Sequence, residues 1–179
     1  MSSCFAQYSK AFIAAVNSIR LLVVNFSPPN SSFFSFSTRI TTPHPPGPGG
    51  WAAVVLLENG RKELFGGEKL TTNNRMELTA AIKALEYFTE DKKKQLLLKN
   101  FKIYTDSNYV KDGITVWINK WEKNNWKTSD KKNVKNIDLW KKLKLLVKSN
   151  QIEWYWVKGH SEDPMNDLAD KLAKRATPI

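Results

Sequence analysis

A short strand that ends in an acidic residue constrains the fold of this chain more than any other feature. Phe101, Ile103 and Thr105 alternate with a lysine and a tyrosine, the period-2 pattern of a strand, and Asp106-Ser107 follow directly. Open α/β sheets place their chemistry in the crevice beyond the strand ends. Asp106 is therefore a candidate site residue, although such a residue can also serve only as the cap of the next helix.

The segments around this strand predict an α/β fold. WAAVVLLE (51–58) is typical of a buried strand, Asn59-Gly60 indicates a hairpin, and 61–70 is its antiparallel partner, with Gly66-Gly67 marking a bulge or a close approach. Residues 152–158 predict a further strand. Helices are predicted after Thr72 or Asn73, from Ser107 through Trp121, after Asn136 as a cap, and after Asp163-Pro164. This order predicts a mixed sheet with helices packed on it.

The amino-terminal part has a different composition from the rest. Residues 1–46 are rich in Ser, Phe and Pro, the run PHPPGPGG is typical of a loop, and all 17 acidic residues begin at Glu58. An acid-free, Ser-rich start fits an organelle-targeting peptide, and it fits a misassigned or frame-shifted start equally well. We therefore expect an atypical segment 1–46, in which 33–39 can supply a first strand, and a regular domain over 47–179.

Charge and composition narrow the class of partner. The formal net charge of +11 favours a polyanionic partner, although many basic proteins do not bind nucleic acid. The single cysteine, Cys4, excludes an internal disulfide and a cysteine-rich zinc site. Arg20 interrupts the best apolar stretch, so we expect no membrane-spanning helix. GPGG lacks the Lys-Ser/Thr of a phosphate-binding loop.

Three further polar residues are candidates to work with Asp106. Glu77 lies in the first turn of a predicted helix, where it can also act only on the helix dipole. Asp170 follows Asn166 and Asp167 by one turn, so these polar groups are expected on one helix face, with Asp167 as a plain solubility charge. His160, in the loop KGHSED, is either simply exposed or a proton shuttle. Carboxylates from separate elements would bind magnesium through oxygen.

Together these residues resemble ribonuclease H of the bacterial type. The resemblance covers roughly Gly47 to Ala176 and rests on GPGG, TTNNRMEL, YTDSNYV, residues 113–140, and WVKGH followed by Pro164, Asn166 and Asp170. It implies a ribonuclease H-like fold, a five-stranded mixed sheet flanked by helices. It also implies a monomeric, cytoplasmic, Mg²⁺-dependent endonuclease, with Mn²⁺ as an alternative, that hydrolyses the RNA strand of RNA–DNA hybrids. Organelle import stays open.

The resemblance assigns roles to the acidic residues and the histidine. By motif position, Glu77, Asp106 and Asp170 match three of the family's four catalytic, metal-binding carboxylates, and His160 matches its mobile catalytic histidine. The fourth carboxylate is expected eleven residues before Gly50, where this chain has Arg39, and no acid lies upstream of Glu58. We therefore expect weak or absent cleavage by this chain. A non-catalytic protein that binds RNA–DNA hybrids is the alternative, and an integrase-like DNA nuclease is disfavoured by TTNNRMEL and the lysine-rich segment together.

The resemblance also implies how a hybrid is held. The lysine-rich stretch between Trp117 and Lys135 resembles the family's basic protrusion, which grips the phosphates of the DNA strand, although Trp117 is also a core candidate. Asparagines beside Glu77 would read the RNA 2′-hydroxyl or cap the helix. The expected hybrid-binding residues are Asn73, Asn74, Asn108, Trp117, Lys120, Trp121, Lys123, Lys127, Lys131, Lys132 and Asn166.

Overall fold

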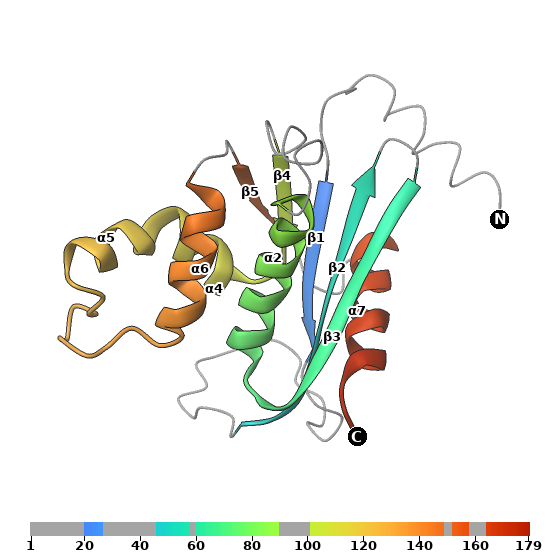
Figure 1. The fold of residues 1–179 in the computed structure, drawn as a ribbon, viewed down its shortest axis with the longest axis horizontal. Coiled ribbons are helices and arrows are strands. Elements are labelled where there is room, and N and C mark those ends of the chain that lie inside the picture. The colour runs from blue at the N-terminus through green and yellow to red at the C-terminus, as the bar shows by residue number, and fades with distance from the viewer. Residues whose placement is uncertain (1–19, 27–45, 58–59, 90–100, 149–151, 158–163) are drawn as a thin grey trace.

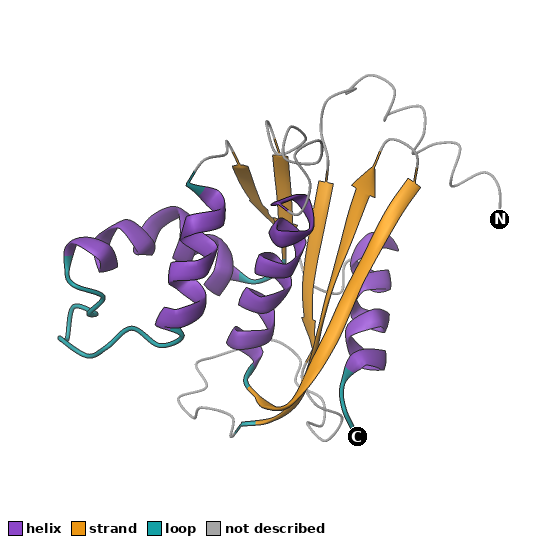
Figure 2. Ribbon diagram, viewed as in Figure 1, coloured by secondary structure: helices purple, strands orange, loops and turns teal. Residues whose placement is uncertain are grey.

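The computed structural model describes residues 20–26, 46–57, 60–89, 101–148, 152–157 and 164–179 (Figure 1). Five strands form one sheet in the order β3-β2-β1-β4-β5, with β1 antiparallel to β2 and parallel to β4, and β5 parallel to β4. The strands are β1 (Arg20–Phe26), β2 (Gly47–Leu57), β3 (Gly60–Thr71), β4 (Phe101–Thr105) and β5 (Ile152–Trp156). The five-stranded mixed sheet flanked by helices is confirmed (Figure 2).

The central strand, β1, comes from an unexpected part of the sequence. It is formed by Arg20–Phe26, whereas the segment 33–39, which was expected to supply a first strand, lies outside the described residues. Four consecutive apolar residues, Leu21 to Val24, suit a strand with neighbours on both sides, because such strands have near-continuous hydrophobic runs. Phe34 and Phe36 alternate with serines, a pattern better suited to a strand with one polar face. The sheet therefore does not begin at residue 47.

The register of β1 locates the backbone beside Asp106. Val23 pairs with Thr105 in the parallel ladder between β1 and β4. Continuing this register by one residue sets Val24 beside Asp106. Arg39, the residue expected at the place of the fourth carboxylate, lies outside the described residues. The position next to Asp106 on the central strand is thus held by an apolar residue.

Helices cover the two faces of the sheet (Figure 1). Alternate residues of β2 belong to separate cores: Ala53 and Val55 pack in the cluster formed with helix α2 (Asn73–Thr89) and helix α6 (Ile137–Val147). Ala52 and Val54 pack instead against helix α7 (Pro164–Ala176). Because successive strand residues point to opposite faces, α7 lies across the sheet from α2 and α6.

A three-part helical segment follows Asp106. Helix α4 (Asn108–Asp112) continues through the π-helical turn η2 (Gly113–Trp117) into helix α5 (Ile118–Lys123). Gly113 lies against the buried Trp140 of α6, since a Cβ built on Gly113 would lie 1.9 Å from Cη2 of that ring. No helix among the described residues is both long and apolar enough to cross a membrane.

Gly50 and Gly67 allow close packing of backbone on backbone, whereas a Cβ on Gly66 would meet the side chain of Trp51. A Cβ on Gly67 would lie 2.1 Å from the carbonyl oxygen of Ala176, so this position is a close approach, while the irregularity in the β2–β3 ladder lies between Gly47 and Gly49. Residues 47–50 were expected in a loop, but they form the first part of β2. Their pairing with β3 explains the difference, because a partner strand can hold glycines extended that have no strand preference of their own.

Candidate functional site

Ser107 brings two of the predicted site residues together. It is the N-cap of α4, where its Oγ accepts a hydrogen bond from the backbone N–H of Val110 (3.1 Å). The same hydroxyl donates to Oε2 of Glu77, which lies in the first turns of α2. The capping role therefore belongs to Ser107 and not to Asp106. Glu77 is thus tied to the residue that directly follows Asp106 at the end of β4.

Asp170 approaches from α7, on the other face of the sheet. Its side chain is 7% exposed, and the neighbouring Asn166 is 0% exposed. The sequence predicts one polar face for Asn166, Asp167 and Asp170, but only Asp167 is exposed. Asn166 and Asp170 lie on the buried side of α7 with Ala169 and Ala173, which pack on β2. A carboxylate in such a place requires a hydrogen-bonding partner or a cation.

The three predicted carboxylate ligands are of the chemical type that a hard cation such as Mg²⁺ binds. Carboxylate oxygens are the ligands that Mg²⁺ prefers, and Glu77, Asp106 and Asp170 supply them from three elements. Within the described ranges, however, no three His, Cys, Asp or Glu side chains are grouped closely enough to hold a metal ion. His160 lies outside these ranges. The metal-binding and catalytic roles of these four residues therefore stay predictions.

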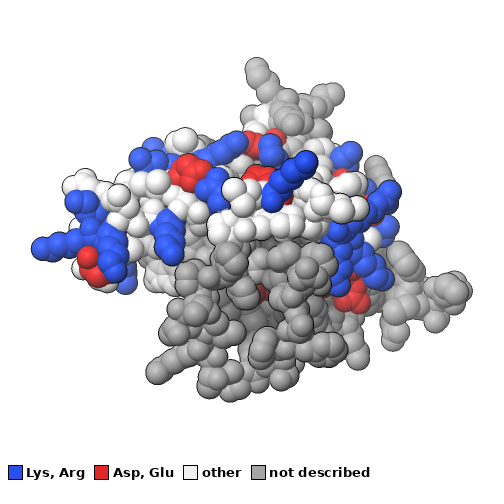
Figure 3. All heavy atoms as spheres, turned by 90° about the horizontal axis from the view of Figure 1, so that it is seen from below, with Lys and Arg blue, Asp and Glu red and all other residues white. Residues whose placement is uncertain are grey.

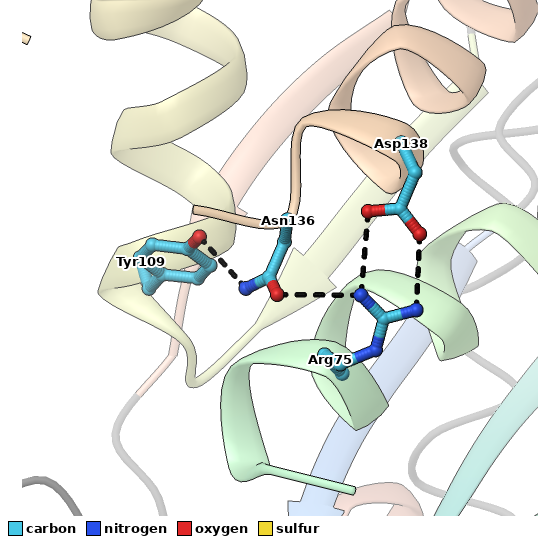
Figure 4. A network of polar contacts seen from close by, with 4 residues as sticks. All are labelled: Arg75, Tyr109, Asn136 and Asp138. Atoms are coloured by element: carbon cyan, nitrogen blue, oxygen red, sulfur yellow. Dashed lines mark hydrogen bonds and ion pairs between the residues drawn. The ribbon is translucent and has the colours of Figure 1, made fainter. Parts of the chain in front are cut away.

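A polar network that the sequence did not reveal joins α2 to the start of α6 (Figure 4). Arg75, two residues before Glu77, donates to both carboxylate oxygens of Asp138 (3.3 and 3.0 Å) and to Oδ1 of Asn136 (3.4 Å). Asn136 in turn donates to the hydroxyl of Tyr109 on α4 (3.2 Å), which also accepts from Nε1 of Trp140 (3.0 Å).

Asn136 occupies the N-cap position of α6 as predicted, and the network explains why its side chain makes no capping hydrogen bond. Asn136 has a left-handed backbone (φ 57°) and makes no side-chain capping bond, because its amide bridges Arg75 and Tyr109 instead. The network also fixes the end of the lysine-rich stretch to two helices. These are α2, which contains Glu77, and α4, which begins two residues after Asp106. The pattern Arg-x-Glu in TTNNRMEL gave no signal for this contact, since its partners lie 61 and 63 residues away.

The Arg75–Asp138 pair predicts a pH-dependent contribution to stability. The hydrogen bonds from Arg75 lower the pKa of Asp138 below its ordinary value. A lowered folded-state pKa means that the stabilisation is present above the unfolded-state pKa near 4 and is lost as the pH falls through the folded value. Because the Asp138 side chain is 58% exposed and solvent screens the pair, we expect Asp138→Asn to lower the free energy of unfolding by only about 0.5 kcal/mol at pH 7.

The measurement is urea unfolding of the unaltered protein and Asp138→Asn at pH 7 and pH 3. The difference between them should shrink toward zero at pH 3. Asp167→Asn is the matched control, because Asp167 is an exposed carboxylate on a different helix, α7. A difference for Asp138→Asn that is equally large at both pH values would contradict the assigned ion pair.

The lysine-rich stretch forms a projecting basic unit. Figure 3 shows Lys and Arg side chains gathered at the end of the molecule where Figure 1 places α5 and the loop after it. The lysines named above in this stretch are all exposed, as are Asn73, Asn74 and Asn108 at the starts of α2 and α4. Asn166 is the exception among the expected hybrid-binding residues, because its burial leaves no accessible surface to touch a nucleic acid.

Aromatic rings and unusual backbone angles shape this protrusion. The rings of Trp117 and Trp121 lie 5.7 Å apart, and Trp121 packs edge-on against the buried Trp140 (5.4 Å). Trp117 is half-buried, so the expectation of a core position holds only in part. All four non-glycine residues with positive φ in the described ranges, Asn125, Trp126, Lys131 and Asn136, lie in or beside the loop after α5. Such backbone conformations cluster where the surrounding structure fixes a functional segment.

Comparison with known proteins gives a consistent result. The family model described as RNase H matches residues 41–177. A Ribonuclease H from Dechloromonas aromatica is 58% identical over 130 residues, which cover 73% of this chain and 83% of the relative. A Ribonuclease H from Parvibaculum lavamentivorans is 52% identical over 130 residues, covering 73% of this chain and 82% of the relative.

Solved structures agree on the fold. The crystal structure of LC9-RNase H1, a type 1 RNase H with the type 2 active-site motif, has a TM-score of 0.70 and 26% identity, and the match covers 90% of this chain and 72% of that chain. LC11-RNase H1 in complex with an RNA/DNA hybrid has a TM-score of 0.60 at 18% identity, covering 89% of this chain and 96% of that chain. The latter similarity concerns the fold alone.

Proposed function

We propose a function from one premise: this chain belongs to the ribonuclease H family. By that membership it is a nuclease and a hydrolase, a ribonuclease H enzyme. The proposal is that it binds RNA–DNA hybrids and cleaves their RNA strand slowly, because one of the family's four carboxylates is missing. The observation that supports this proposal most directly is the hydrogen bond from the Ser107 hydroxyl to Glu77. Because Ser107 directly follows Asp106, this bond connects the Glu77 carboxylate to the end of β4.

In this proposal Glu77, Asp106 and Asp170 would hold Mg²⁺ with three carboxylates, where the family arrangement has four. A bound Mg²⁺ pair would activate a water and stabilise both oxygens of an in-line phosphodiester displacement. Affinity for two dications depends on clustered negative charge. No acid precedes Glu58, and the central strand sets Val24 beside Asp106, so the chain supplies no fourth carboxylate from β1. The lack of a preformed three-ligand group in the described ranges supports weak metal binding.

Substrate binding is proposed to be less affected than cleavage. The exposed lysines of the protrusion lie away from the carboxylates in sequence and belong to α5 and the loop after it. Their contacts with phosphates need no metal and give affinity that falls steeply with salt. Exposed amides at Asn73, Asn74 and Asn108 lie at the starts of the two helices that meet at Ser107, where they can reach a minor groove and its 2′-hydroxyls.

A cleavage assay with a labelled RNA–DNA hybrid and Mg²⁺ tests the proposal. We expect turnover at least about 100-fold below that of the Dechloromonas aromatica relative under the same conditions, because loss of one electrostatic group at a reacting centre commonly has this effect. Asp106→Asn should remove the remaining cleavage. Turnover equal to that of the relative would contradict the proposed impairment, and cleavage of plain duplex DNA would contradict the proposed substrate.

Binding in a chelator separates the enzyme from its alternative. The unaltered chain should bind the hybrid in excess chelator with a strong salt dependence, whether or not it cleaves. Zero turnover with intact hybrid binding would favour the non-catalytic hybrid-binding protein. Loss of hybrid binding as well would refute both readings.

A further inference from the structure

One peptide group of the candidate site is anchored at both of its polar ends. The carbonyl oxygen of Asp106 accepts a hydrogen bond from the indole Nε1–H of Trp156 (3.0 Å). The N–H of the same peptide group, that of Ser107, donates to Oγ1 of Thr105 (3.1 Å). The plane that joins Asp106 to Ser107 is therefore fixed by side chains from two adjacent strands.

The anchor comes from the last residue of β5. Trp156 pairs with Thr105 in the parallel β4–β5 ladder, and the N–H of Val157 extends the ladder by donating to the carbonyl of Thr105 (2.9 Å). The Trp156 side chain is 46% exposed, so burial of its ring does not account for its position. Its indole N–H instead reaches across to the chain segment that has just left β4.

The orientation of this peptide group matters because of its two neighbours. Rotation about the bonds that flank a peptide plane redirects both adjoining Cα–Cβ bonds. One of these carries the Asp106 carboxylate, and the other carries the Ser107 hydroxyl that bonds to Glu77. A single hydrogen bond to the Asp106 carbonyl thereby restrains two of the proposed carboxylate ligands relative to each other.

We propose that Trp156 is a positioning residue for the candidate active site, acting through its indole N–H on the Asp106–Ser107 peptide group. It touches neither substrate nor metal in this role. The inference deepens the proposed function but does not depend on catalysis, because the anchor exists without metal or hybrid. The role of Trp156 can therefore be tested on the metal-free protein, through the exchange rate of the Ser107 amide.

The experiment is amide hydrogen exchange by NMR on metal-free Trp156→Phe, which retains an aromatic ring and removes the N–H. We expect the Ser107 amide to exchange about three- to tenfold faster, the change that loss of one net hydrogen bond produces. Trp154→Phe is the matched control on the same strand. The buried Nε1 of Trp154 has no hydrogen-bond partner in the described part of the chain, so removing it should leave the Ser107 rate unchanged.

Two further readouts complete the test. Thermal unfolding of both variants shows whether faster exchange is local or global, and only an effect on Ser107 at unchanged melting temperature supports positioning. If Trp156→Phe does not fold, the test is the exchange rate of the Trp156 indole N–H in the unaltered protein. A hydrogen-bonded N–H on an exposed ring exchanges more slowly than the N–H of free tryptophan. Equal Ser107 rates in all three proteins, or unprotected exchange of the Trp156 indole, would overturn the inference.

A Mg²⁺ titration then distinguishes this inference from the proposed function. If Mg²⁺ binds, Trp156→Phe should weaken its affinity about three- to tenfold and Trp154→Phe should not. If Mg²⁺ binds to none of the proteins while the Ser107 exchange responds as expected, the proposed metal site fails and the positioning role of Trp156 stands. Equal Mg²⁺ affinity in all three proteins would contradict the functional part of that role.

Discussion

Replacing Val24 by Asp should raise the rate of hybrid cleavage by about 100-fold or more, because it returns an electrostatic group to the reacting centre. The β1–β4 register pairs Val23 with Thr105 and so sets residue 24 beside Asp106. A carboxylate there adds negative charge where Glu77 and Asp106 are already joined through Ser107. The measurement is turnover on a labelled RNA–DNA hybrid across a Mg²⁺ series, in which the half-saturating Mg²⁺ concentration should also fall.

Val24→Asn is the matched control, since asparagine has nearly the shape of aspartate without its charge. It should not restore turnover. In the absence of metal, Val24→Asp should be less stable than Val24→Asn, because a carboxylate clustered with others is costly until a cation neutralises it. Added Mg²⁺ should raise the melting temperature of Val24→Asp more than that of Val24→Asn. Equal turnover of both variants would show that residue 24 is not the place of the missing carboxylate.

Replacing Gly113 by Ala should lower the free energy of unfolding by about 1–3 kcal/mol, the usual range for overpacking a core. A Cβ at this position would lie 1.9, 2.5 and 2.8 Å from three carbons of the Trp140 ring. That ring is fully buried and its Nε1 donates to Tyr109, so it has little room to shift. The backbone of Gly113 is ordinary right-handed helix (φ −56°), where Ala alone would be favoured by about 1 kcal/mol. We expect the steric cost of a Cβ beside the Trp140 ring to outweigh the higher helix propensity of Ala.

Gly47→Ala is the control for this substitution, because a Cβ on Gly47 meets no atom within 4 Å. Its effect should stay within about 0.5 kcal/mol, as for other open surface positions. Urea unfolding measures both variants. A Gly113→Ala protein as stable as the unaltered one would contradict the prediction, because it would mean that η2 and α6 can move apart at Trp140 without loss of stability.

Local patterns were sufficient to predict most elements of this fold. β4, α2 and α7 have clear periodicity and clear start signals, and the Asn59-Gly60 dipeptide correctly predicted that β2 and β3 pair as a hairpin. The first strand was different, because the alternating pattern of residues 33–39 was expected to supply it and the structure forms it from Arg20–Phe26. Only pairing with β2 and β4 selects Arg20–Phe26, and such register is a property of distant residues.

The candidate site was predicted in its residue types but not in its supporting contacts. Asp106-Ser107 left open which residue caps the next helix, and the structure assigns the cap to Ser107. Asp170 was expected on a polar helix face and is instead buried, because α7 packs with that side toward β2. The roles of Arg75, Asn136 and Trp156 depend on contacts between residues 27 or more positions apart, which no local pattern encodes.

The place of β1 in the sheet has a consequence for synthesis on the ribosome. Of the described strands, β1 emerges first and must sit between β2 and β4, yet β4 begins 81 residues after Arg20 (101 − 20). The nascent chain therefore carries an apolar strand with one unsatisfied edge until Thr105 has left the exit tunnel. Such delayed partners slow folding and expose a template for aggregation. Chaperone dependence during translation should accordingly be greatest over this interval, and it should end when β4 docks.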